Sequence, residues 1–198
     1  MRTTTAILAL LLVAGALSCK SQPDRLLLDV HHVGPGKVTV DGVADAHRKD
    51  LATQDAHDVH YRRYWVDTSS GTIFCLAEAP SADAAVDVHR EAHGLLADEV
   101  REVVPGILPA AASGNAPLFM DTHQLEPGLK AADVAEAHRK DLAVQARHGV
   151  RFLEYWVDEK NGCIHCLVEA PDAAAVLAAH REAHGLVPQT VQPVVEGH

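Results

Sequence analysis

Basic residues are scarce in this chain of 198 residues, which contains 17 Lys and Arg against 27 Asp and Glu. The formal net charge of -10 argues against a nucleic acid or an anionic membrane surface as the partner and favours cations. Cysteines are also few, and the odd number left after Cys19 does not predict a disulfide framework. The sequence has no phosphate-binding loop, haem-attachment motif or nucleophile-base pair, so an enzyme built on it would have to use a bound metal.

The chain has one long apolar run, which lies at the N-terminus. Residues 6–17 follow a positive residue, which is the pattern of a secretory signal peptide, and they are too few for a permanent membrane span. The four residues ending at Cys19 resemble a bacterial lipobox, with Ala in place of the usual first Leu. We expect residues 1–22 to direct export as a periplasmic or cell-envelope lipoprotein, attached to the membrane only through Cys19. A soluble secreted protein is the alternative.

The rest of the chain is one module written twice. The block His-Arg-Glu-Ala-His-Gly-Leu occurs at residues 89–95 and 180–186, and Ala-His-Arg-Lys-Asp-Leu-Ala occurs at 46–52 and 137–143. Two copies of roughly 80 residues indicate a duplicated domain, because solenoid repeats are shorter and more numerous. We place the modules at residues 26–104 and 118–195, joined by a linker rich in Pro, Gly and Ala at residues 105–117.

Each module has the same order of predicted elements. In the first module the pattern predicts a strand, a helix, a two-stranded hairpin, a second helix ended by Gly94, and a last strand. The predicted elements of this module cover residues 26–32, 41–52, 61–67, 72–79, 80–93 and 99–104. The order β-α-β-β-α-β is the split motif of ferredoxin-like folds, so we predict an α+β protein with strand order 4-1-3-2 in each module.

Five strings recur in both modules in the same order. They are Asp-x-His, Ala-His-Arg-Lys-Asp-Leu, Tyr-Trp-Val-Asp, Phe-Cys-Leu-x-Glu-Ala-Pro and His-Arg-Glu-Ala-His-Gly-Leu, with small departures in the second copy. As a set they resemble the small nickel-binding ferredoxin-like proteins first recognised in streptomycetes, many of which carry only a domain-of-unknown-function label. The resemblance covers both modules and implies a fold that pairs as a dimer and binds nickel. Here the two copies would pair within one chain. The second copy departs at Cys163 and at His165, which replaces an aromatic residue.

Histidines recur at positions that can meet in space. His89 and His93 are four residues apart on a helix and share a face, whereas Glu91 points away, which argues against a His-Glu-x-x-His protease. In a 4-1-3-2 sheet the first strand ends, the first helix starts and the second helix ends at the same edge. We therefore expect two histidine clusters: His31, His47, His89 and His93 in the first module, and His123, His138, His165, His180 and His184 in the second. His57, His60 and His148 are expected at the opposite edge as solvated residues.

Carboxylates accompany these histidines. Asp50 and Asp141 follow a cluster histidine by three residues, close enough to bind the same ion or to orient the imidazole. Strand alternation places further carboxylates on the same strand face as a histidine or an aromatic residue; these are Asp29, Asp121, Glu78 and Glu169. We expect the two sheets to face one another across a polar cavity lined by Asp29, His31 and Glu78 and their counterparts. A solvated sheet face is the alternative.

Imidazole with carboxylate suits Ni(II), Zn(II), Cu(II) or Co(II), and the preference for nickel comes from the resemblance. Neutral imidazoles with a pKa of about 6.5 predict binding that weakens below about pH 6. Cys163 and Cys166 point to opposite sides of a strand, so we interpret Cys75 and Cys166 as buried apolar residues. The sequence thus predicts a protein that binds nickel for storage, buffering or delivery. A metal-dependent or dimeric-barrel-type small-molecule enzyme is the second hypothesis, and a structural envelope protein with incidental histidines is the third.

Overall fold

The computed structural model describes residues 25–106 and 110–198, and within them one order of elements occurs twice. The first copy consists of β1 (Arg25–His32), α1 (Val40–Thr53), the 3-10 helix η1 (Gln54–His57), β2 (His60–Asp67), β3 (Thr72–Ala79), α2 (Ala82–Ala92) and β4 (Glu99–Glu102). The short strand β5 (Val104–Pro105) follows. The second copy consists of β6 (Leu118–Gln124), α3 (Ala131–Val144), η2 (Gln145–His148), β7 (Arg151–Asp158), β8 (Cys163–Glu169), α4 (Ala173–Ala183) and β9 (Thr190–Gly197).

The predicted signal peptide and lipid anchor, residues 1–22, lie outside the described residues. Among the helices that the structure describes, none is long and apolar enough to cross a membrane.

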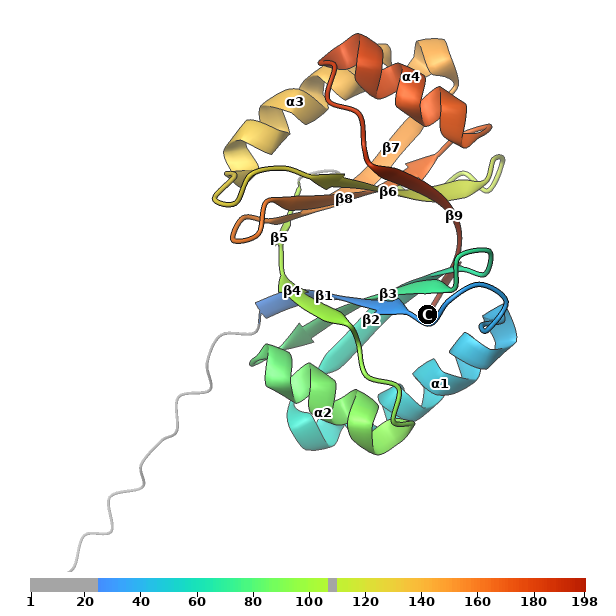
Figure 1. Cartoon of the computed structure of the whole chain (residues 1–198), viewed down its shortest axis with the longest axis vertical. Coiled ribbons are helices and arrows are strands. Elements are labelled where there is room, and N and C mark those ends of the chain that lie inside the picture. The colour runs from blue at the N-terminus through green and yellow to red at the C-terminus, as the bar shows by residue number, and fades with distance from the viewer. Residues whose placement is uncertain (1–24, 107–109) are drawn as a thin grey trace, which may run out of the picture.

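Each module forms a four-stranded sheet in the predicted order, β4-β1-β3-β2 in the first and β9-β6-β8-β7 in the second. Helices α1 and α2 cover the outer face of the first sheet, and α3 and α4 cover the outer face of the second (Figure 1). The two inner faces are turned toward each other (Figure 1). This arrangement confirms the prediction of an α+β fold with two ferredoxin-like modules that pair within one chain.

Two strands join the sheets. β9 completes the second sheet and also pairs with β2 of the first, where Val195 lies opposite Val66. β5 pairs with β7 of the second module, where Val104 lies opposite Val157, and only Val103 separates β5 from β4 of the first sheet. Figure 1 shows β5 and β9 crossing between the sheets on opposite sides. The strands therefore follow one another around a closed, barrel-like ring.

Apolar side chains of both modules form a core between the sheets, and polar residues such as Arg63, Glu154 and His165 line cavities beside it. Trp65 and Trp156 are buried there, with ring centroids 5.1 Å apart. The other buried members are Leu28, Val30, Phe74, Leu76, Val103, Met120, Leu153, Leu167 and Val194. Interdigitation of apolar side chains is how two packed sheets form a common core.

The prediction that Asp29 and His31 line a polar cavity between the sheets is therefore wrong, whereas Glu78, predicted with them, does line the space between the sheets beside Leu76 and Glu154. Asp29 and His31 and their counterparts, Asp121 and His123, lie on the sheet face that the helices cover. On β1 the alternate positions carry apolar side chains, including Leu28 and Val30, and these take the inner face. An inner face shared by two sheets excludes water, so unpartnered carboxylates there would be costly.

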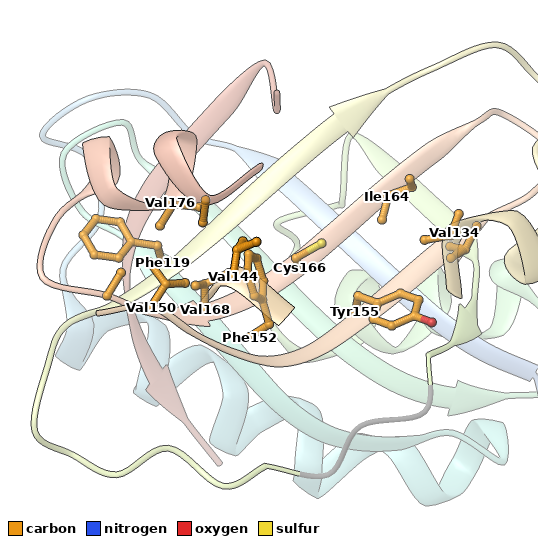
Figure 2. Packing of buried hydrophobic residues seen from close by; sticks show 13 residues of the cluster. Phe119, Val134, Val144, Val150, Phe152, Tyr155, Ile164, Cys166, Val168 and Val176 are labelled. Carbon is orange, nitrogen blue, oxygen red and sulfur yellow. The ribbon is translucent and has the colours of Figure 1, made fainter. Parts of the chain in front are cut away.

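A second apolar layer lies between each sheet and its helices. Figure 2 shows this layer in the second module, where Phe119, Phe152 and Tyr155 pack with Val134 of α3 and Val176 of α4. Cys75 and Cys166 are buried in the corresponding layers, as predicted. Cys163 lies on the other face of β8, and all three are free thiols.

The segment expected as a linker is held against the second module. The backbone N–H of Gly106 donates to the carbonyl oxygen of Tyr155 at 2.8 Å. The hydroxyl of Ser113 donates to Glu169 Oε1 at 2.6 Å, and the backbone N–H of Asn115 donates to the same oxygen at 3.2 Å. Arg151 pairs with the other oxygen of Glu169 at 2.6 Å.

Candidate metal centres

The last turn of α2 presents the central histidines of the first module. Ser81 caps the start of the helix by accepting from the N–H of Ala84, and Gly94, with φ +80°, ends it. The N–H of Gly94 donates to the carbonyl oxygen of His89 at 2.8 Å. Helix α4 is built in the same way, from the cap Asp172 to Gly185. Both helices therefore carry a histidine on the last turn and a second one at the first residue after it.

His89 is the centre of the first cluster. Its Nε2 lies 2.9 Å from Asp29 Oδ2 and its Nδ1 lies 3.0 Å from Asp50 Oδ1. The same Asp50 oxygen lies 3.0 Å from Nε2 of His93, so two imidazoles converge on one carboxylate. We call the Asp29 side of His89 the strand side and the Asp50 side the helix side.

Further donors surround His89. The ring of His31 lies 5.0 Å from that of His89, and Cys75 offers a sulfur within 4.8 Å of nitrogens of both. His47 packs against Tyr64, with ring centroids 4.7 Å apart. Neither ring nitrogen of His47 has a hydrogen-bond partner, and Nδ1 of His31 has none either.

The second module repeats this cluster around His180. Its Nε2 lies 3.1 Å from Asp121 Oδ2, and its Nδ1 lies 3.0 Å from Asp141 Oδ1, although not aligned for a hydrogen bond. Nε2 of His184 lies 3.1 Å from the same Asp141 oxygen. His123 lies 3.4 Å from Asp121, and its ring lies 4.8 Å from that of His180. His138, with its ring 4.5 Å from that of Tyr155, lies 3.9 Å from Asp141.

The histidines within a cluster differ in pKa. Burial disfavours a charged imidazole, but hydrogen bonds to Asp29 and Asp50 raise the pKa of His89 to about 9. The equivalent carboxylates raise the pKa of His180 to about 9. By contrast, burial and the neighbouring His89 lower the pKa of His31 to about 4. At neutral pH the central imidazole of each cluster is therefore protonated, and its positive charge lies between two carboxylates.

The donor set fits a divalent cation. With its imidazoles neutral, each cluster carries two buried carboxylates, a charge that one divalent ion would neutralise. Buried polar atoms nearly always have hydrogen-bond partners, and exceptions call for an explanation such as a bound ion. In the described residues most such unpartnered atoms, all but Trp65 Nε1 and Arg101 Nε, lie in these clusters: Asp29 Oδ1, His31 Nδ1, both nitrogens of His47, Asp121 Oδ1, His138 Nε2, Asp141 Oδ1 and His180 Nδ1. Nickel, zinc, copper and cobalt all accept this mixture of nitrogen and oxygen ligands.

Three residues expected with the clusters lie elsewhere. His165 is on the inner face of β8, where Nδ1 bonds to the Thr122 hydroxyl at 3.0 Å and the ring contacts Phe74. Its position in the sequence indicated the right edge of the sheet, but strand alternation turns it away from the helices. Glu78 forms an ion pair with Arg62. Glu169 accepts hydrogen bonds from the 105–117 segment and is likewise not part of a cluster.

The expectation that His57 and His148 are merely solvated was incomplete. His57 bonds to Glu91 at 3.0 Å, and His148 bonds to Glu182 at 2.6 Å. These pairs link each 3-10 helix to the following long helix and account for the Glu in the repeated block. His60 is exposed, as expected.

Sequence reasoning missed one functional neighbour of the central histidine. The hydroxyl of Tyr61 lies 3.0 Å from Nε2 of His89 and 3.2 Å from Asp29 Oδ2. The equivalent residue of the second module is Phe152, whose ring lies 5.0 Å from that of His180. Alignment of the two copies shows the Tyr-to-Phe difference, but not that it falls beside the cluster.

The fold and the clusters define a class: a duplicated ferredoxin-like α+β barrel with one His–Asp cluster in each module. The family described as nickel responsive protein SCO4226-like matches residues 28–103 and 119–194. These matches span most of the chain, so the chain belongs to this family and carries two tandem copies of its domain. The predicted family is thereby confirmed.

Two solved structures are similar to this chain. SCO4226 from Streptomyces coelicolor A3(2) is 41% identical over 44% of this chain and 99% of its own, with a TM-score of 0.37. The chlorite dismutase from Candidatus Nitrospira defluvii, solved in complex with imidazole, is 8% identical over 87% of this chain and 90% of its own, with a TM-score of 0.51. At that identity the similarity concerns the fold alone. A search of curated proteins found no match.

Proposed function

We propose that this protein binds one divalent transition-metal ion in each module, with nickel as the physiological ion, and that it stores, buffers or delivers that ion. The observation that carries the proposal is the pair of clusters with unpartnered buried donors around His89 and His180. Membership of a nickel-responsive family supports nickel over zinc, copper or cobalt.

The helix side of each central histidine offers the same three donors in both modules. In the first they are Asp50, His89 and His93, and in the second Asp141, His180 and His184. In each group the ligand atoms lie within 4.8 Å of one another. Two imidazoles and one carboxylate leave further positions on an octahedral ion, which the neighbouring His47 or His138 and water can fill.

Export is part of the same proposal. The signal-peptide pattern of residues 1–22 and the lipobox resemblance at Cys19 support delivery to the cell envelope and attachment there through a lipid. The negative charge of the chain suits a protein that attracts cations outside the cytoplasm.

The experiment is a metal titration of protein purified without a His tag. Replacing His89 and His93 together by Ala should remove one of two nickel equivalents, because both are donors of the first cluster. The module should remain folded, because both residues lie at a helix end and only His89 is fully buried. His57→Ala is the matched control, because it removes a histidine of the same module that is outside the cluster. Retention of both equivalents by the double variant, or loss of nickel from the control, would contradict the proposal.

A further inference from the structure

The two central histidines have different neighbours on the strand side. Tyr61 of β2 places its hydroxyl against His89 and Asp29, and it also reaches the carbonyl oxygen of Ala85 at 3.2 Å. Phe152 occupies the equivalent position in β7 and brings no hydroxyl to His180. The strand side of the first cluster therefore receives a hydroxyl group, whereas that of the second faces a phenyl ring that forms no hydrogen bond.

The space beside the two clusters also differs, as a second observation that is independent of Tyr61 and Phe152. A cavity of about 20 Å³ adjoins His89, whereas a cavity of about 140 Å³ adjoins His180. The larger cavity is lined by His123 and His180, by the helix-side residues His138, Asp141 and His184, and by apolar residues that include Leu125 and Leu129. One water molecule needs about 10–15 Å³ of such volume, so the first cavity admits about one water and the second admits several.

The donors on the strand side differ as well. In the second module Asp121, His123 and His180 bring their ligand atoms within 4.8 Å of one another, and all three are buried. Oδ1 of Asp121 has no hydrogen-bond partner. In the first module the corresponding group consists of His31, His89 and Cys75, while the Asp29 carboxylate accepts from Tyr61.

We propose that the modules are unequal, because the second holds its ion on the strand side, through Asp121, His123, His180 and water, and does so more tightly. The first module, closed on that side by Tyr61, is confined to the helix side. This inference rests on the function proposed above. A buried two-imidazole, one-carboxylate group beside a cavity with room for water gives an octahedral ion both its protein ligands and its remaining shell.

The two modules suggest a matched pair of substitutions, because the same fold holds Tyr at this position in one module and Phe in the other. Tyr61→Phe gives the first module the second module's residue, and Phe152→Tyr does the reverse. Calorimetric titration of the whole protein with Ni(II) should show two steps in the wild type, separated by about 10- to 100-fold in affinity. Phe152→Tyr should weaken the tight step to the level of the weak one, and Tyr61→Phe should strengthen the weak step.

Thermal unfolding of each metal-free variant checks that the fold is intact. The His89/His93 double Ala variant, which keeps the second module complete, should retain the tight step. Two equal steps in the wild type, or an unchanged titration for Phe152→Tyr, would overturn the inference and leave the proposed function standing. Absence of any nickel binding would remove the proposed function itself, and this inference with it.

Discussion

Metal binding by this protein should release protons well above the pH at which ordinary histidines are neutral. In the metal-free protein, carboxylates hold the pKa of His89 and of His180 at about 9, in spite of burial. An ion that binds to either imidazole must displace its proton. His31, His47 and His138 contribute little near neutrality, because burial lowers the pKa of His31 to about 4 and also lowers those of His47 and His138.

The expected magnitude follows from this count. One proton leaves per module, so the affinity of each site should rise about tenfold per pH unit between about pH 6.5 and 9, or about 100-fold over two units. For unperturbed histidines the metal affinity would stop rising near pH 7, so the pH range expected here lies higher. The difference arises from the two carboxylates on either side of each central imidazole.

Calorimetry in two buffers of equal pH and different ionisation enthalpy measures the proton count. At about pH 7.5 we expect nearly two protons per chain when both modules are filled with nickel. Asp29→Asn removes one partner of His89 outside the helix-side group, and should reduce the proton count of the first module. A count near zero at this pH, or an affinity that stops rising above pH 7, would refute the assignment of these protons to the central imidazoles.

Three further predictions concern stability. The pKa values of His89 and His180 rise on folding, so their contribution to the free energy of unfolding is present below pH 6.5 and is lost as the pH rises through about 9. With chelator present, the melting temperature should therefore fall between about pH 7 and 9.5, and a rise would contradict this. Burial opposes ionisation of Glu169, yet hydrogen bonds from Ser113 and the backbone lower its pKa to about 2. The contribution of Glu169 to the free energy of unfolding is therefore present above pH 4.5 and is lost toward pH 2. In urea unfolding Glu169→Gln should therefore cost about 1–3 kcal/mol at neutral pH and little near pH 2, whereas equal costs would exclude an ionic role. Trp156→Ala should cost about 3–5 kcal/mol and lower the unfolding midpoint of both modules together, whereas separate midpoints would show that the inter-sheet core does not couple them.

The fold was predictable because its evidence is local and is written twice. Alternating apolar residues, the Gly94 stop and the hairpin between β2 and β3 each predict an element from neighbouring residues. The order of those elements then selects one topology. The edge at which histidines gather follows from that topology, and the structure brings His31, His89 and His93 together there.

It was harder to predict which face of each strand is turned toward the helices. Period-two alternation separates Asp29 and His31 from Leu28 and Val30, but it does not say which set faces the helices. That choice depends on a second sheet covering the first, which is a contact between residues far apart in the sequence. The apolar set on the alternate positions was the available signal. The same ambiguity led to the misplacement of His165.

The two strands that cross between the modules have a consequence for how the protein is made. During synthesis the first module emerges long before β9, yet its β2 strand pairs with β9. Until the last strand arrives, that edge of the first sheet is open and able to pair with another chain. We expect the nascent first half to be the species most prone to aggregate or to capture a neighbour, and chaperones to be needed most at that stage. Closure of the ring by β9 would end this vulnerable period for both halves at once.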